Sequence, residues 1–123
     1  MDHLLARGPS QEYWFEEGVF ITELLNHPAV ADASVARARL PAGRRTRWHA
    51  LDGTSEHYII ESGTGVAEVG PQSIRVGPGD QVIIPAGERQ RIAADPGAEL
   101  VFLCVCTPRF EPQNYRDLEA LHG

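Results

Sequence analysis

The chemistry of this chain is concentrated between residues 43 and 63, where His49 precedes Glu56 by seven positions. A loop of turn-forming residues, 52–55, separates them, so their side chains are expected on neighbouring antiparallel strands. Inside a small barrel alternate residues point inward, and the two side chains can then meet. A neutral imidazole beside a carboxylate suits a divalent metal. It also describes a hydrogen-bonded pair without metal, and spacing alone favours that second interpretation.

Short strands must position these residues, because turn-forming Gly, Pro and Asn interrupt the chain every few positions. Apolar patterns predict strands at 17–25, 33–40, 44–51, 56–61, 66–69, 73–76, 81–84, 90–93 and 99–106. Only 115–121 has a helical pattern, with Asn114 as its N-cap. We therefore expect an all-β fold, a closed barrel or sandwich without exposed strand edges. Its parts are expected to be an arm (1–12), the barrel (13–113) and a short C-terminal helix (114–123).

Composition limits the class of partner. The chain has 123 residues and a formal net charge of -6, which fits one domain and argues against nucleic acid or a membrane as partner. The first residues contain no long apolar run, so we expect no signal peptide and a cytoplasmic location. Cys104 and Cys106 share one face of a strand and are interpreted as reduced, half-buried side chains. A catalytic thiol is the less favoured alternative.

Two spaced motifs resemble those of a single-domain cupin. Gly43, His49, Glu56 and Gly63 match the first motif of that family in register. The second motif is matched by three residues of the stretch 79–90, namely Gly79, Pro85 and Gly87. The chain also resembles the small cupins described as mannose-6-phosphate isomerase-like. The resemblance implies a cupin jelly-roll β-barrel, and it carries little weight for a specific activity.

The chain departs from the metal-binding pattern of the family it resembles. Leu51 stands at the second histidine of the first motif, and Gln90 stands at the histidine of the second. The resemblance therefore implies a reduced metal site of His49, Glu56 and Gln90, in which the amide is a weak oxygen ligand. The ion would be divalent, with Mn, Fe, Ni and Zn as candidates. Ala94 replaces the motif's asparagine.

Further residues near the two motifs are candidates for catalysis and substrate binding. Tyr58 and Glu56 are predicted to handle protons, although core packing is the favoured alternative for Tyr58. Arg47 is predicted to bind an anionic substrate group, and a solvated position at the surface is an equal alternative. His57 and Leu51 are the other predicted substrate contacts, but His57 points outward unless the strand is bulged.

Three functions remain open from the sequence. The first is a metal-dependent enzyme of isomerase or lyase type that acts on a small polar molecule, such as a sugar or keto acid. The second is a metal-free cupin that binds a small ligand as a sensor or carrier, and the third is a purely structural domain. The first is preferred by a small margin. A homodimer is expected as well, because Trp14, Trp48 and the apolar run 99–106 exceed the needs of so small a core.

Overall fold

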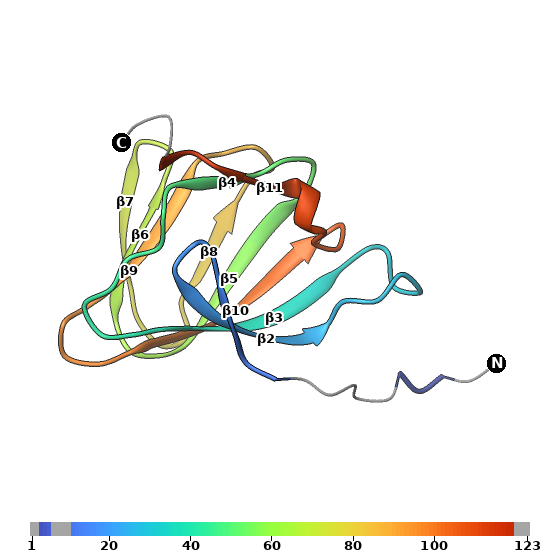
Figure 1. Cartoon of the computed structure of the whole chain (residues 1–123). Helices are drawn as coiled ribbons and strands as arrows, with labels where there is room; N and C mark the ends of the chain where they lie inside the picture. Colours follow the sequence, from blue (N-terminus) through green and yellow to red (C-terminus); the bar gives the residue numbers. More distant parts are fainter. Residues whose placement is uncertain (1–2, 6–10, 120–123) are drawn as a thin grey trace.

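The structure is a computed structural model, and it describes residues 3–5 and 11–119. The regular secondary structure of its described part is almost entirely β-strand (Figure 1). The strands are β1 (Tyr13–Phe15), β2 (Val19–Leu25), β3 (Ser34–Leu40), β4 (His49–Leu51), β5 (Ser55–Ser62), β6 (Gly65–Val69), β7 (Gln72–Val76), β8 (Gln81–Ile84), β9 (Gln90–Ala94), β10 (Leu100–Thr107) and β11 (Tyr115–Asp117). Within the described residues, no helix has the length and apolar character needed to cross a membrane.

All the predicted strands are confirmed, with shifted ends. The segment 44–51 differs most, since only its last three residues form β4, preceded by an isolated bridge from Arg45 to Ala93. The three-residue strand β1 was not predicted, because it is too short to show a pattern, and β11 lies in the segment that was predicted to be helical.

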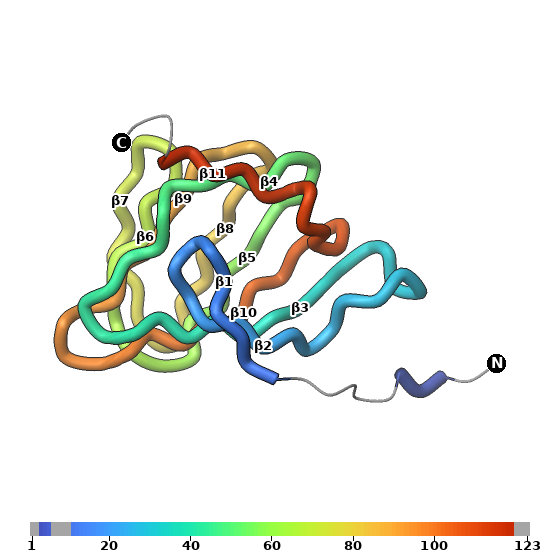
Figure 2. Tube along the Cα trace, viewed as in Figure 1, coloured from blue at the N-terminus to red at the C-terminus, as the bar shows by residue number. Residues whose placement is uncertain are grey.

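The strands form two antiparallel sheets rather than one closed barrel, so the expected closure is wrong. One sheet has the order β1-β2-β3-β10-β5-β8, and the other has the order β11-β4-β9-β6-β7. Figures 1 and 2 show the two sheets curving around a common interior. Among the described residues each sheet keeps two unpaired edges, and side chains packed between the sheets hold them together.

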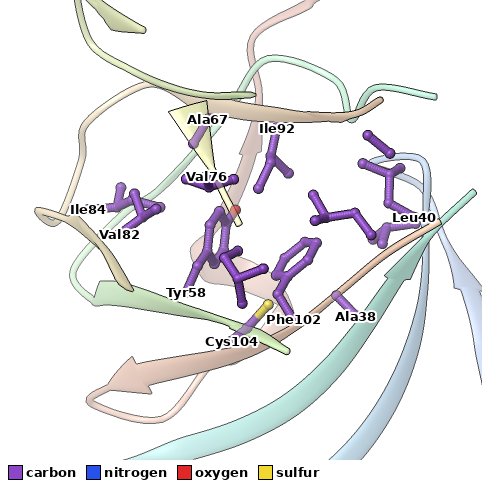
Figure 3. Packing of buried hydrophobic residues seen from close by; sticks show 14 of the residues in the cluster. Ala38, Leu40, Tyr58, Ala67, Val76, Val82, Ile84, Ile92, Phe102 and Cys104 are labelled. Atoms are coloured by element: carbon purple, nitrogen blue, oxygen red, sulfur yellow. The ribbon is translucent and has the colours of Figure 1, made fainter. Parts of the chain in front are cut away.

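A core of aliphatic and aromatic side chains fills the space between the sheets (Figure 3). Phe102, Leu40 and Ile92 are among its largest members and are almost completely inaccessible to solvent. On β5 the burial alternates, so Glu56, Tyr58 and Ile60 face inward as predicted from the sequence. The register of β5 therefore determines which of its side chains can reach an internal site.

The predicted C-terminal helix is wrong over its described part. A short 3-10 turn at Pro112–Asn114 is followed by β11, which pairs with β4 through Tyr115 and Leu51. The side chain of Asn114 accepts a hydrogen bond from the backbone of Glu111, so it closes this turn instead of capping a helix. Cross-strand pairing outweighs the weak helical pattern. Residues 120–123 of the predicted helix lie outside the described part.

Two glycines allow strands to approach each other closely: Gly63, which ends the first motif, and Gly65 two residues later. Gly63 has a φ of 83°, and a Cβ atom there would overlap the carbonyl group of Glu99. A Cβ atom on Gly65 would overlap the carbonyl oxygen of Ala93 on the neighbouring strand β9. The glycines therefore fix the packing of the turn between β5 and β6.

Candidate active site

A pocket opens between the two sheets at the end that carries β1, β4 and β11. Aromatic residues form much of its wall: Tyr13, Phe15, Phe110 and Tyr115. Aliphatic side chains form the rest of its apolar surface: Ile21, Leu25, Val35, Ala36 and Leu51. Fewer side chains of the pocket can act as acids, bases or nucleophiles, namely His49, three glutamates and two cysteines. A mostly apolar pocket with a few converging polar groups is typical of a small-molecule site.

An ion pair between Glu17 and His49 lies in this pocket. Glu17 lies in the turn between β1 and β2, where its backbone carbonyl accepts a hydrogen bond from the amide of Arg47 at 2.7 Å. This contact brings the β1–β2 hairpin against the segment that leads into β4 (Figure 2). The carboxylate Oε2 of Glu17 then lies 2.8 Å from Nε2 of His49. The imidazole side chain is 2% exposed and the carboxylate 15%, so water screens this pair very little.

Both ring nitrogens of His49 face hydrogen-bond acceptors. Nδ1 lies 2.6 Å from the backbone carbonyl of Arg47, and Nε2 faces the carboxylate of Glu17. An imidazole can satisfy two acceptors only when both nitrogens carry protons. Burial disfavours the charged ring, but the charge and hydrogen bond of Glu17 and the carbonyl of Arg47 together raise the pKa of His49 to about 9. His49 is therefore an imidazolium at neutral pH.

Glu56 is the buried carboxylate that faces this pair. Its Oε2 is 3.8 Å from the thiol of Cys106, and its Oε1 has no hydrogen-bond partner among the described residues. Burial and then the charge of Glu17 raise the pKa of Glu56 to about 7, against the opposing effect of His49. The carboxyl group therefore exchanges its proton near neutral pH, as a general acid or base must.

The predicted metal ligands do not form a metal site in this arrangement. A metal requires an unprotonated ring nitrogen, and both nitrogens of His49 are engaged as donors. The amide oxygen of Gln90 accepts the hydroxyl of Tyr58 at 2.6 Å. Over residues 3–5 and 11–119, no group of three or more His, Cys, Asp or Glu side chains is placed to hold a metal ion.

The structure brings together only part of the predicted site. His49, Glu56 and Leu51 all line the pocket. Gln90 is the backbone partner of His49 across β4 and β9, and its amide favours the ionised form of Glu56 without making a hydrogen bond of normal geometry. Tyr58 is packed in the hydrophobic core.

The other two predicted substrate contacts lie outside the pocket. Arg47 is exposed and forms an ion pair with Asp117 at 3.1 Å. His57 pairs with Val105 and Ile83 in a regular part of β5, so the bulge that would turn it inward is not observed there. Arg47, His57 and Tyr58 therefore take no part in the function proposed below.

Two functional residues were missed from the sequence, Glu17 and Tyr115. Tyr115 stacks on His49 with ring centroids 5.4 Å apart, and its hydroxyl has no hydrogen-bond partner among the described residues. Glu17 follows another glutamate in a turn, and Tyr115 was assigned to a helix. Their local sequence carries no signal of a site, because the pairing of β11 with β4 and the hairpin turn place them there.

The cysteines next to Glu56 are free, as predicted, and they are buried rather than half-buried. Burial, followed by the charge of Glu56, raises the pKa of both thiols. Both side chains are therefore protonated at neutral pH, and a thiolate nucleophile is disfavoured.

Comparison with known proteins places this geometry in a family. A family model for the cupin domain matches residues 36–106. The uncharacterised protein MJ1618 of Methanocaldococcus jannaschii is 30% identical over 112 residues, which cover 89% of this chain and 86% of that protein.

Solved structures share the fold. Pac13, described as a unique nucleoside dehydratase, superposes with a TM-score of 0.74 at 19% identity, covering 88% of this chain and 83% of that one. A variant of the Streptomyces protein was solved with uridine. A predicted oxalate decarboxylase from Thermotoga maritima gives a TM-score of 0.72 at 27% identity, covering 80% of this chain and 91% of that one.

Proposed function

Because this chain belongs to the cupin family, we propose that its pocket is an acid–base active site of isomerase or lyase type for a small polar organic molecule. The observation that carries the proposal is that one pocket is lined by both a buried imidazolium, His49, and a buried carboxyl group, Glu56, whose pKa is about 7. Two titratable groups with such different protonation in one pocket are characteristic of acid–base catalysis.

The polar groups of the pocket have complementary roles. Ionised Glu56 takes a proton from a carbon next to a substrate carbonyl, using the oxygen that has no other partner. The free hydroxyl of Tyr115, whose ring stacks on His49, stabilises the negative charge that develops on the substrate oxygen. Glu17 holds the imidazolium in place.

The fate of the proton distinguishes the two reaction types. In an isomerisation of a hydroxy carbonyl compound, Glu56 returns the proton to the former carbonyl carbon, while the proton of the adjacent hydroxyl group moves to the former carbonyl oxygen. In an elimination, it delivers the proton to a leaving hydroxyl, which departs as water. Both routes restore the ionised carboxylate of Glu56 and need no further reagent. The dehydratase description of Pac13, which has the same fold, supports the elimination route.

The sequence predicted that a divalent metal ion takes part in this reaction. Such an ion polarises a carbonyl group as a Lewis acid. The predicted ligands His49, Glu56 and Gln90 do not fit it while the ring is doubly protonated and the amide oxygen is engaged. We therefore assign no step to a metal.

Proton exchange tests the proposal without knowledge of the product. The full chain is incubated in deuterium oxide with a panel of small carbonyl compounds and polyols, and mass spectrometry measures deuterium incorporation and loss of water. We expect at least one compound to exchange, and Glu56→Gln to slow it at least about 100-fold. The matched control is Glu88→Gln, which removes a charge outside the pocket. Equal exchange by Glu56→Gln would refute the role of this carboxyl group.

Ligand binding without turnover is the second candidate function. Leu51 and Gln90 at two histidine positions favour it, and so does the mostly apolar wall of the pocket. A compound that raises the melting temperature of the protein, but neither exchanges nor loses water, would support this function instead.

Homodimerisation and a cytoplasmic location stay predictions. Trp14 is 57% exposed, which is consistent with an interface. Trp48 is covered within the same chain by Arg89 and Arg91, whose guanidinium groups lie over its ring. Sedimentation of the full chain at micromolar concentration tests the dimer, and a monomer there would refute it.

A further inference from the structure

The charged groups of the pocket are unequal in number. Three carboxyl side chains line it, those of Glu17, Glu23 and Glu56, and His49 is the one cation found there among the described residues. Because Glu17 already neutralises His49, the remaining carboxyl groups leave the pocket negative near neutral pH. The tyrosine hydroxyl of Tyr13 reflects this field, since burial and then the charge of Glu23 raise its pKa to about 12.

No described arginine lines the pocket, and the nearby ones have partners elsewhere. Arg109 contacts the pocket residue Asn26, but its second guanidinium nitrogen lies 2.9 Å from Glu111. Arg47 is paired with Asp117 on the outer surface. A carboxylate or phosphate entering the pocket would therefore lose its hydration without gaining a free cationic partner.

The apolar wall of the pocket favours a flat ligand. The rings of Phe15 and Tyr115 meet edge to face at 5.1 Å, and Phe15 also contacts Phe110 at 6.2 Å. Together these three rings form an aromatic side beside the polar groups His49 and Glu56. Such a surface packs against a planar group while the carboxyl groups accept hydrogen bonds from it.

We infer that this pocket selects neutral or cationic small molecules that have a planar part and hydrogen-bond donors, and that it rejects anions. The inference rests on the pocket of the proposed function and narrows its substrate class. It removes keto acids from the predicted substrates and retains uncharged compounds. Specificity of this kind comes from the repulsion of the wrong charge as much as from contacts with the right one.

Three isosteric probes test the inference: benzamide, benzamidinium and benzoate have the same planar ring and differ in charge. Their affinities for the full chain are measured near neutral pH from NMR shifts of the backbone amides of Leu51, Cys106 and Tyr115. We expect benzamide and benzamidinium to bind, and benzoate to bind at least about tenfold more weakly. Benzoate binding as tightly as benzamide would overturn the inference, as would the absence of pocket shifts with every probe at ~10 mM.

A pair of variants links the discrimination to the pocket. Glu23→Gln removes an exposed carboxyl group at the pocket without changing Glu17, His49 or Glu56. We expect this variant to reduce the ratio of benzamide affinity to benzoate affinity about threefold. Glu88→Gln, outside the pocket, should leave this affinity ratio unchanged. An equal effect of both variants would overturn the inference. These binding measurements need no turnover. If the probes bind in the expected order but no compound exchanges deuterium, the proposed catalysis is refuted and the inference about charge selection stands.

Discussion

The carboxylate of Glu17 lies 2.8 Å from Nε2 of His49 and joins the turn of the β1–β2 hairpin to strand β4 of the other sheet. This contact makes His49 a buried cation instead of the neutral ring that a metal requires. The same carboxylate also raises the pKa of Glu56 from a distance, after the effect of burial. The protonation state of the whole pocket thus depends on one residue in a turn.

Replacing Glu17 is expected to lower the pKa of His49. The folded-state pKa of about 9 exceeds the ordinary value of 6.5, so the resulting stabilisation is present below about pH 6.5 and is lost as the pH rises through 9. Glu17→Gln should therefore destabilise the fold by about 3 kcal/mol near pH 6 and by much less near pH 10. NMR titration of the His49 ring and urea unfolding at several pH values measure both effects. Glu16→Gln, in the same turn, is the matched control, and an unchanged His49 titration in Glu17→Gln would contradict the expectation.

Replacing Glu56 is expected to stabilise the protein at high pH. Its folded-state pKa of about 7 exceeds the ordinary 4.5, so its contribution to stability is present below about pH 4.5 and is lost as the pH rises through 7. Glutamine does not ionise, so Glu56→Gln should be more stable than the parent by about 3 kcal/mol near pH 8 and similar to it near pH 4.5. Chemical unfolding across this range is the measurement. A destabilised variant near pH 8 would show that the carboxylate is better solvated than its burial implies.

The buried Tyr58 and the half-buried Tyr115 should separate catalysis from stability. The hydroxyl of Tyr58 donates to Gln90 inside the core, so Tyr58→Phe should lower the free energy of unfolding by about 1 kcal/mol and leave deuterium exchange nearly unchanged. The hydroxyl of Tyr115 has no partner to lose, so Tyr115→Phe should preserve stability and slow exchange at least about tenfold. Reversed effects would return the catalytic role to Tyr58, as the sequence predicted.

Tight metal binding should require histidines at positions 51 and 90, where the cupin motifs have histidine and this chain has Leu51 and Gln90. The parent chain, purified without affinity tag or chelator, is expected to contain much less than one metal ion per chain by elemental analysis. The double variant Leu51→His/Gln90→His adds imidazoles beside His49 and should gain zinc or nickel affinity at least about tenfold, seen by calorimetry. Stoichiometric metal in the parent would restore the metal-dependent form of the proposal.

Substitution of Gly63 or Gly65 is expected to destabilise the fold. A methyl group on Gly63 or Gly65 meets backbone carbonyl groups that cannot move aside, so Gly63→Ala and Gly65→Ala should each destabilise the fold by about 2 kcal/mol or more. Gly97→Ala is the control, because nothing lies near a Cβ atom at that position. Melting temperatures measure the difference, and equal values for the three variants would contradict the close approach.

Much of the fold could be predicted because short-range patterns determine it. Alternating burial placed Glu56 and Tyr58 on the inner face of β5, and Gly and Pro marked the turns. Closure and the C-terminal segment could not be predicted in this way. They depend on pairing between distant strands, such as β11 with β4, which local propensity does not encode.

The site was harder to predict than the strands. His49 and Glu56 line one pocket, but they come from different sheets and not from the neighbouring strands that their spacing predicted. The state of His49 depends on Glu17, which also belongs to the other sheet. For Arg47 the structure shows the surface position that the sequence left as an equal alternative, because Asp117 on β11 holds it there. Protonation and pairing across sheets are properties of the assembled fold, and no single segment reveals them.

The β1–β2 hairpin lies before the matched cupin region, which begins at residue 36. Tyr115 lies beyond its end at residue 106. A protein trimmed to the shared region would retain Glu56 and His49 and lose the groups that charge and cover them. Relatives that look alike in the shared region can therefore differ in chemistry, and the flanking segments are where that divergence should be sought.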